Sequence, residues 1–513
     1  MNAWTEGYVA EIPYTLGYYR ELSPIMLALE LTIKGLRAPD VSQPLTYCEL
    51  GYGLGLSLLV HSANFPNIQF YGTDFNPAHA THARQLAAEA GLTNVNLYDD
   101  SFEQLVERGL PAMDFICLHG IYSWISPRNR QVIVHFIDRH LKPGGVVYVS
   151  YNALPGWAAA APMRELMRLY GERMCGPSVP MLAKVKAAID FLGDLKGRNM
   201  LYFQSLPNLD KRIERLNAGN PNYVAHEYLN REWHPQYFFE VAEEMSAARL
   251  TYACPGQLVE HIDVAMLPKA VIEHLKQVPD VILKETLRDF YLNQQFRRDL
   301  FTRGAARLLP EENLNRLLDQ RWILITAPES IQFKLTVGSG EITLDEAAHK
   351  PVVEALADGP LNGRALMERP AVGALGQNRL MQALVLLTAA GYLQPMVPKS
   401  VAEPAIATTE RFNAAVISQA DDSELGYIAC PLTGQAVGRA RIGMMHMDIY
   451  RSGVREEDAM AAEMWKRLSK RGQRMVTDGK TLETAEENLR HLRELAAQFL
   501  RNEVPRLRSL SLI

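Results

Sequence analysis

A glycine-rich stretch near the amino terminus constrains the fold more than any other feature of this sequence. The apolar run Thr46–Leu50 leads into three glycines at alternate positions, Gly51, Gly53 and Gly55. A glycine turn between a strand and a helix lets a ligand approach the backbone, because no Cβ keeps it away, and it presents free N–H groups. The dinucleotide fingerprint requires a further glycine where this chain has Leu56. The loop therefore argues against NAD or FAD.

The next hundred residues alternate between strand and helix patterns. Apolar runs at 68–73, 95–98, 113–118 and 146–151 predict four further strands. Near-continuous apolar strands joined by helices indicate a parallel sheet buried on both faces. The predicted fold class is therefore α/β, with a doubly wound, Rossmann-like sheet. Asp74 follows the second strand, where a carboxylate can accept hydrogen bonds from ribose hydroxyls; the alternative is an acid that caps the helix starting near Pro77.

The pattern acid-x-Gly-x-Gly-x-Gly, with Glu49 first, resembles the first motif of class I S-adenosylmethionine (SAM) methyltransferases. The later signals also fall in the order that this class shows, ending with Leu141-Lys-Pro-Gly-Gly145 before the fifth strand. The resemblance implies SAM as cofactor. It implies a cofactor site made of Glu49, Gly51, Gly53, Gly55, Asp74, Phe75, Asp99, Asp100, Ser101, Phe102 and His119.

The residues after the third strand carry the adenine part of this implied site. Asp100 or Ser101 would accept a hydrogen bond from the adenine amino group, and Phe102 would pack on the ring. Asp99 is the main alternative, because spacing does not separate neighbouring residues of one loop. A merely flexible turn remains the structural alternative for the three glycines.

Phrases further along the chain resemble the methyltransferase regulatory domain. They are Ala225-His-Glu-Tyr-Leu229, Trp233-His-Pro-Gln-Tyr-Phe-Phe239 and Phe296-Arg-Arg-Asp-Leu300. This domain follows the catalytic domain in a bacterial family that includes rickettsial-type lysine methyltransferases acting on outer-membrane proteins. The resemblance implies methyl transfer to protein lysine, with a homodimer as the expected assembly. The alternatives are a small-molecule methyltransferase and a non-catalytic SAM-binding scaffold or sensor.

The methyl acceptor is expected above the ends of the fourth and fifth strands. A lysine must first lose its proton, which costs about 4.6 kcal/mol at pH 7 from an ordinary pKa near 10.4. Aromatic walls, including Trp157, would lower that cost by desolvation, although each tryptophan fits a core position equally well. The candidate catalytic residues are His119, Tyr122, Trp124, Tyr151 and Asn152, with His119 as a base, a cofactor contact or a loop residue.

The chain divides by pattern into four expected domains. These are a SAM-binding domain with an amino-terminal arm at 1–160, a helical regulatory or dimerisation domain at 161–315, a winged-helix-like α+β domain at 316–400, and a last domain at 401–513. A linker rich in Pro, Ala and Thr is expected around 397–409. The arm carries Tyr8, Tyr14, Tyr18 and Tyr19, which would form either a lid over the cofactor or a cover for a sheet edge.

Composition excludes several classes of function. The net charge of −5 provides no field that would attract nucleic acid or an anionic membrane. Five scattered cysteines form no C-x-x-C pair, so neither a zinc site nor a disulfide framework is predicted, and no metal is expected. No apolar run reaches membrane length, and we expect a cytoplasmic protein.

Overall fold

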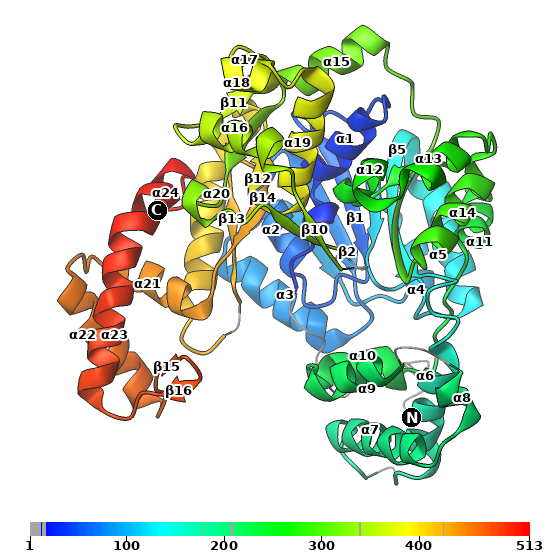
Figure 1. Ribbon diagram of the computed structural model, residues 1–513, viewed down its shortest axis with the longest axis horizontal. Coiled ribbons are helices and arrows are strands. Elements are labelled where there is room, and N and C mark those ends of the chain that lie inside the picture. The colour runs from blue at the N-terminus through cyan, green and yellow to red at the C-terminus, as the bar shows by residue number, and fades with distance from the viewer. Residues whose placement is uncertain (1–11, 13–16, 177, 206–208, 338–339, 424) are drawn as a thin grey trace.

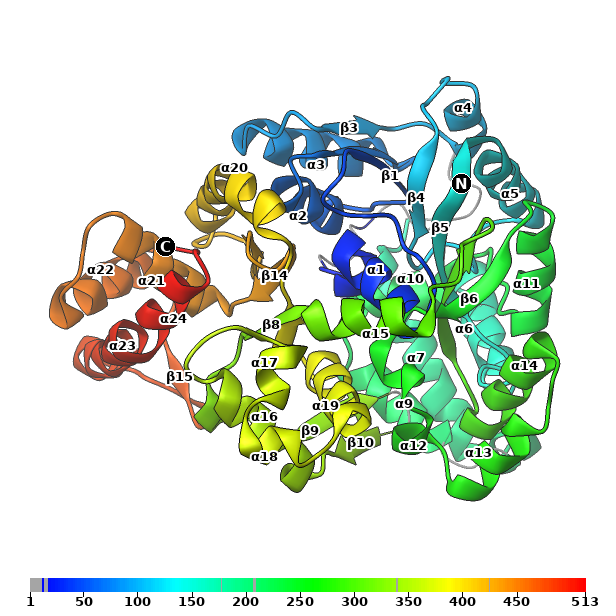
Figure 2. The same ribbon diagram turned by 90° about the horizontal axis from the view of Figure 1, so that it is seen from above.

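The computed structural model describes residues 12, 17–176, 178–205, 209–337, 340–423 and 425–513. Its centre is a seven-stranded sheet with the strand order β3-β2-β1-β4-β5-β7-β6 (Figures 1 and 2). The first five strands run parallel, and β7 runs antiparallel to both β5 and β6. The strands are β1 (Leu45–Leu50), β2 (Ile68–Thr73), β3 (Val95–Tyr98), β4 (Met113–Leu118), β5 (Leu141–Asn152), β6 (Thr251–Pro255) and β7 (Phe296–Thr302).

Both faces of this sheet are buried. Because successive side chains of a strand point to opposite faces, Tyr47 and Cys48 of β1 belong to two different apolar clusters. The face with Tyr47 packs against α1 (Pro24–Ile33), α2 (Leu56–Asn64) and α3 (Pro77–Glu89). The face with Cys48 packs against α4 (Phe102–Val106), α5 (Pro127–His140) and α11 (Phe238–Ser246). The predicted doubly wound α/β fold is confirmed.

Two strands of the sheet come from beyond the expected boundary at residue 160. β5 pairs antiparallel with β7, from Val146 opposite Thr302 to Asn152 opposite Phe296. The segment between them leaves the sheet and returns to it, so the domain boundary predicted at residue 160 cuts through one folded layer. We propose that residues 251–302 be counted with the SAM-binding domain.

The excursion from the sheet forms a separate helical group (Figure 1). Its members pack around a third apolar cluster that includes Met167, Leu192 and Ala225. They are α6 (Ala161–Arg173), α7 (Met181–Gly197), α8 (Leu201–Gln204), α9 (Leu209–Ala218) and α10 (Pro221–Leu229).

A second set of helices links the sheet to a small α+β region. The linking helices are α12 (Asp263–Met266), α13 (Lys269–Lys276), α14 (Val281–Leu292) and α15 (Pro310–Asp319). The α+β region has a three-stranded sheet in the order β11-β8-β12 and a hairpin of β9 and β10. Its elements are β8 (Arg321–Leu324), β9 (Lys334–Val337), β10 (Gly340–Thr343), α16 (Glu346–Leu356), β11 (Leu361–Asn362), α17 (Gly363–Met367), α18 (Pro370–Gly373), α19 (Gln377–Ala389) and β12 (Leu393–Pro395).

Most of the expected linker around 397–409 belongs instead to a long helix, α20 (Lys399–Ser418). Alanines favour the helix, and Val401 and Phe412 are buried, 1% and 0% exposed. Thr408 donates a hydrogen bond to the carbonyl of Ala63 at the end of α2, over 2.6 Å. The linker prediction was wrong because proline and threonine content does not reveal the apolar face that holds this helix against α2.

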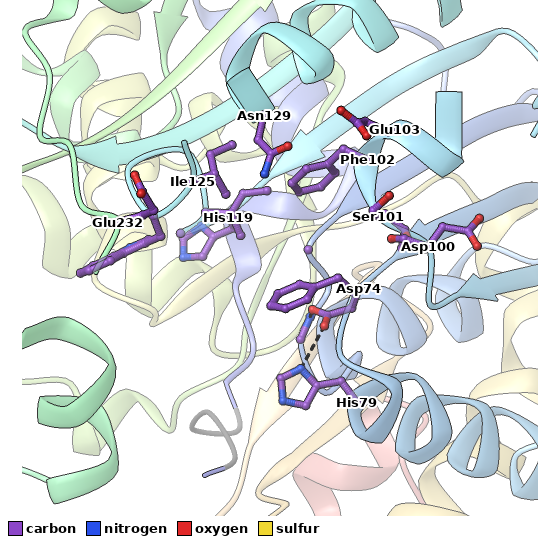
Figure 3. A pocket seen from close by; sticks show the side chains of 17 residues that line it. Asp74, His79, Asp100, Ser101, Phe102, Glu103, His119, Ile125, Asn129 and Glu232 are labelled. Carbon is purple, nitrogen blue, oxygen red and sulfur yellow. Dashed lines mark hydrogen bonds and ion pairs between the residues drawn. The ribbon is translucent and has the colours of Figure 1, made fainter. Parts of the chain in front are cut away.

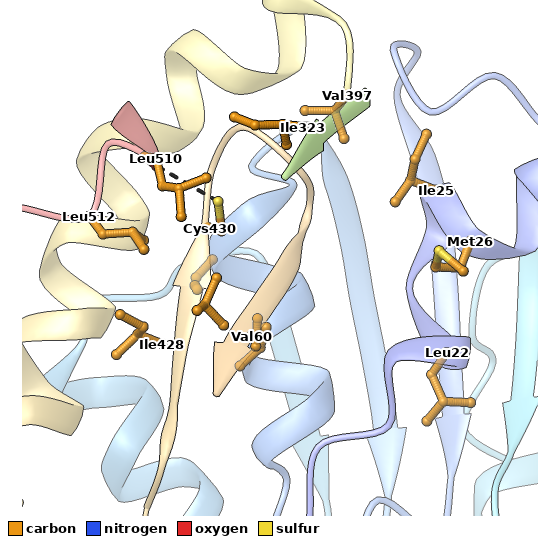
Figure 4. Packing of buried hydrophobic residues seen from close by; sticks show 14 of the residues in the cluster. Leu22, Ile25, Met26, Val60, Ile323, Val397, Ile428, Cys430, Leu510 and Leu512 are labelled. Carbon is orange, nitrogen blue, oxygen red and sulfur yellow. Dashed lines mark hydrogen bonds between the residues drawn. The ribbon is translucent and has the colours of Figure 1, made fainter. Parts of the chain in front are cut away.

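The last part of the chain shares its core with the sheet. In Figure 4, Val60 of α2 lies beside Ile428 and Cys430, which belong to strand β13 (Tyr427–Cys430). Leu510 and Leu512 pack against this strand as well. The remaining elements are β14 (Gln435–Gly438), α21 (Arg441–Arg451), α22 (Glu457–Lys470), β15 (Val476–Thr477), β16 (Lys480–Thr481), α23 (Ala485–Gln498) and α24 (Val504–Ser509). Of the helices that the structure describes, none combines the length and the apolar character needed to cross a membrane.

Candidate active site

The glycine loop joins β1 to α2, and its three glycines have positive φ angles. The values are +75° at Gly51, +58° at Gly53 and +82° at Gly55. A Cβ on Gly55 would lie 2.8 Å from the Cβ of Ala83 in α3, so glycine is needed there for packing. A Cβ on Gly53 would have no protein atom within 4 Å. Gly53 therefore exposes its backbone to a cavity, as a ligand-binding glycine does.

Asp74, directly after β2, holds this loop in place. Its Oδ2 accepts a hydrogen bond from the backbone N–H of Gly53 over 2.8 Å. Its Oδ1 accepts from the N–H of Asn76 over 3.0 Å and lies 3.1 Å from Nδ1 of His79 (Figure 3). These contacts of the carboxylate fix the glycine loop relative to the start of α3, and the Asp74 side chain also lines the cavity. Helix α3 is capped by Asn76, whose side chain accepts a hydrogen bond from the N–H of Ala78, so the alternative of Asp74 as the capping acid was wrong. The contact of Asp74 with the ribose stays a prediction.

A first cavity of about 180 Å³ opens beside Asp74 and Gly53. Figure 3 shows Asp74, Ser101 and Phe102 around it. Eight of the eleven residues that sequence assigned to the cofactor line this space: Gly51, Gly53, Asp74, Phe75, Asp100, Ser101, Phe102 and His119. Sequence reasoning did not single out His79, Ile121, Asn129 or Glu232, which line it too.

Asp99 and Asp100 differ in whether they line the first cavity. Asp100 lines the first cavity and pairs with Arg108. Asp99 lines neither cavity described here and pairs with Arg84 over 2.7 Å, with 44% of its side chain exposed. The cavity lining therefore supports Asp100 rather than Asp99 as the candidate for the adenine contact.

A second cavity of about 380 Å³ adjoins the first. Both are lined by Gly51, Gly53, His119, Gly120 and Trp124. The second cavity continues between the sheet and the helical group, where its walls include Tyr19, Glu49, Gly55, Asn152, Trp157, Tyr223, Glu227, Gln295, Phe296 and Arg298. Tyr8 and Tyr14 of the predicted lid lie outside the described residues, whereas Tyr19 forms part of the wall.

Glu49 reaches this second cavity from β1. Its carboxyl group is buried, 4% exposed, and Oε2 has no hydrogen-bond partner among the residues that the structure describes. Burial, and secondarily the neighbouring Asp74, raise the pKa of Glu49 to about 8. A buried carboxyl without a partner favours a cationic ligand, because such a ligand would supply the missing charge.

His119 lies where the two cavities meet. Its Nδ1 is 2.9 Å from the Tyr148 hydroxyl, and its ring packs on Tyr19 with 3.8 Å between ring centres. Burial lowers the pKa of His119 to about 4. The imidazole is therefore neutral at pH 7, which suits hydrogen bonding to a ligand better than taking a proton from an ammonium group.

Two of the predicted catalytic residues do not reach either cavity. The Tyr122 hydroxyl donates to Glu244, and the Tyr151 hydroxyl donates to Asp299 over 2.6 Å. Both tyrosine side chains are buried, at most 1% exposed. Their catalytic assignment was wrong because each ring points into the core behind the site.

Trp124 and Asn152, also predicted to be catalytic, both line the second cavity, and their catalytic role stays a prediction. The Nδ2 of Asn152 is buried and has no partner within the described part of the chain. Trp124 also lines the first cavity. An aromatic ring and an amide donor thus stand beside the junction of the two spaces.

Comparison with known proteins agrees with this geometry. Residues 48–147 match a family model described as a methyltransferase domain, and residues 220–303 match one described as a predicted methyltransferase regulatory domain. The chain is therefore a class I SAM-dependent methyltransferase with a regulatory domain, as its resemblance to that class implied. It belongs to the same family as the uncharacterized protein sll1526 of Synechocystis sp., to which it is 42% identical over 99% of both chains.

Two rickettsial proteins are also similar. An uncharacterized Rickettsia prowazekii protein, RP789, is 26% identical over 60% of this chain and 54% of its own length. The structure of PKMT2 from Rickettsia typhi in complex with AdoHcy has a TM-score of 0.70 at 20% identity, over 97% of this chain and 99% of that one. The fold is thus shared along nearly the whole length.

The residues of the first cavity, together with Glu49 in the adjoining second cavity, fit SAM as the cofactor. We propose that Asp74 and Asp100 contact the ribose and adenine, that Gly53 allows close approach, and that Glu49 faces the positively charged end of the molecule. SAM supplies a methyl group bound to a positively charged sulfur. The chain's contribution is to hold the donor and an acceptor in line, which can lower the barrier by roughly 7–11 kcal/mol.

Proposed function

We propose that this methyltransferase acts on lysine side chains of a protein substrate. The observation that carries the proposal is the second cavity, which adjoins the cofactor cavity at His119 and Trp124 and combines aromatic walls with carboxyl groups. Aromatic faces and carboxylates both attract an alkylammonium group. Tyr223, which lines this cavity, is 46% exposed, so the space reaches the protein surface and can admit a side chain from a macromolecule.

The chemistry of the walls also supports an amine acceptor. Lysine has to lose its proton before its nitrogen can attack, at a cost of about 4.6 kcal/mol at pH 7. Trp157, 6% exposed, and Tyr19 provide a surface that desolvates the ammonium group and so lowers its pKa. The Rickettsia typhi neighbour PKMT2 has been solved in complex with AdoHcy, which supports a methyl donor beside this cavity.

The test is an unbiased search for the acceptor. The purified protein is incubated with methyl-labelled SAM and bacterial lysates that include an outer-membrane fraction, and labelled proteins are hydrolysed to amino acids. We expect label in methylated lysine. Label confined to small molecules would refute the protein substrate, and SAM binding without any transfer would indicate a scaffold or sensor. The homodimer and the cytoplasmic location stay predictions.

A further inference from the structure

Glu227 belongs to the region that matches the regulatory domain, yet it lines the second cavity. It lies on α10, which is on the side of the helical group that faces the sheet (Figure 1). Across the cavity from this helix stand the glycine loop and Asn152 of β5. A helix distant in sequence from every cofactor motif thus forms one wall of the acceptor space.

The backbone of Glu227 is held by a buried arginine. Arg164 of α6, 1% exposed, donates from Nε to the carbonyl of Glu227 over 2.8 Å and from Nη2 to the carbonyl of Asn230 over 2.7 Å. The guanidinium also lies 4.4 Å from the ring centre of Trp233. Because these contacts fix the end of α10, the carboxyl group projects from a rigid support.

The carboxyl group itself has no hydrogen-bond or ion-pair partner among the described residues. The charged and titratable groups facing it are Arg164 of α6, Arg212 of α9, Tyr223 of α10 and Tyr19. Both arginines are engaged elsewhere: Arg164 on backbone carbonyls, and Arg212 with its Nε 3.2 Å from the Tyr228 hydroxyl and its guanidinium 4.2 Å from the Trp157 ring centre. A carboxylate left unpaired in a cavity calls for a cationic ligand.

We infer that Glu227 binds the ammonium group of the acceptor in the second cavity and takes its proton before methyl transfer, an inference that rests on the proposed lysine methyltransferase function. The N–H proton passes to the carboxylate, leaving a neutral amine and a carboxylic acid. The amine lone pair then forms the N–C bond as the methyl–sulfur bond breaks, and that bond's electron pair stays on sulfur. Glu227 finally releases its proton to solvent.

The acid strengths in the site agree with this role. Burial raises the pKa of Glu227 to about 7, against the opposing effect of Arg164 and Arg212. The pKa of His119 is lowered by burial to about 4, which makes His119 the weaker base. A general base is most effective when its pKa lies near the working pH. Glu49, the other carboxyl in the cavity, lies beside the glycine loop on the cofactor side.

The test compares Glu227→Gln and Glu227→Asp with Glu214→Gln, a matched change at an exposed glutamate of α9 that lines neither cavity. Thermal unfolding checks that each variant folds, and AdoHcy affinity checks the cofactor site. The probe for the acceptor space is n-butylammonium, whose binding to the AdoHcy-loaded protein is followed by saturation-transfer NMR. Lysine methylation is measured from pH 5 to 9 on a substrate found in the lysate search.

We expect Glu227→Gln to bind AdoHcy within twofold of wild type, to bind n-butylammonium at least tenfold more weakly at pH 8, and to methylate lysine at least 100-fold more slowly. The wild-type rate should rise through about pH 7, and Glu227→Asp should regain part of both readouts. Unchanged probe binding and an unchanged pH profile in Glu227→Gln would overturn the inference while leaving the proposed function intact. Absence of lysine methylation by the wild type would remove both.

Discussion

Replacing Gly53 by alanine tests whether the first cavity holds the cofactor. The new Cβ would meet no protein atom within 4 Å, so it would occupy cavity space alone. The left-handed backbone at φ +58° costs an alanine about 1–2 kcal/mol in folding. To make room for SAM, the loop would have to withdraw and break the 2.8 Å hydrogen bond from Gly53 N–H to Asp74.

That hydrogen bond to a charged group is worth about 1.5–3 kcal/mol. At about 1.4 kcal/mol per tenfold, Gly53→Ala should weaken SAM binding about 10- to 150-fold. The control is Gly109→Ala, because Gly109 has a φ of +67°, equally open surroundings and no place in either cavity.

Titration calorimetry with SAM and AdoHcy gives the affinities, and thermal unfolding gives the stability of both variants. We expect similar losses of stability and a loss of affinity in Gly53→Ala alone. Wild-type affinity in a folded Gly53→Ala protein would refute the placement of the cofactor. An equal loss of affinity in Gly109→Ala would show that the effect is general strain.

Three further changes test the remaining parts of the site. Asp74→Ala should weaken SAM binding at least tenfold, a change of about 1.4 kcal/mol. It should also lower the melting temperature, because the carboxylate accepts hydrogen bonds from Gly53 and Asn76. Calorimetry measures the affinity and thermal unfolding the stability, and unaltered affinity would show that Asp74 is not part of the cofactor site. The raised pKa of Glu49, about 8, means that the folded state holds this proton more tightly than the unfolded state, so its contribution to stability is complete below about pH 4.5 and is lost as the pH rises to about 8. Relative to Glu49→Gln, wild type should lose up to a few kcal/mol of unfolding free energy across that window, at about 1.4 kcal/mol per pH unit. If denaturant titrations give the same difference in unfolding free energy between the two proteins at every pH, this prediction is wrong. Tyr151→Phe removes a buried hydrogen bond to Asp299 and should cost about 1–3 kcal/mol of stability, with the methylation rate per folded molecule within twofold of wild type; a large loss of rate would return Tyr151 to the catalytic group.

The glycine loop was predictable from sequence because its determinants are local. Positive φ angles at alternate positions demand glycine, so the spacing of Gly51, Gly53 and Gly55 is visible without a structure. The helix predicted near Pro77 begins at that proline, because the capping side chain of Asn76 and the proline act within one turn. These short-range rules also placed Asp74 beside the loop.

The direction of neighbouring side chains was decided by tertiary packing. Tyr151 and Asn152 are adjacent on β5 and therefore point to opposite faces of the sheet. Asn152 lines the second cavity, whereas Tyr151 donates to Asp299 of β7 inside the core. Sequence alternation shows that two such residues differ in direction but not which of them faces the site. Asp99 and Asp100 were ambiguous for the same reason.

The second cavity depends on the whole fold. Its walls bring together the glycine loop, Asn152 at the end of β5, Glu227 on α10 and Arg298 on β7. No local pattern connects these segments, because β7 reaches the sheet only after the helical excursion and pairs antiparallel with β5. The sequence by itself determined the fold class and the glycine loop that lines the first cavity, through backbone sterics and short-range capping. Long-range packing alone decided which distant side chains line the second cavity.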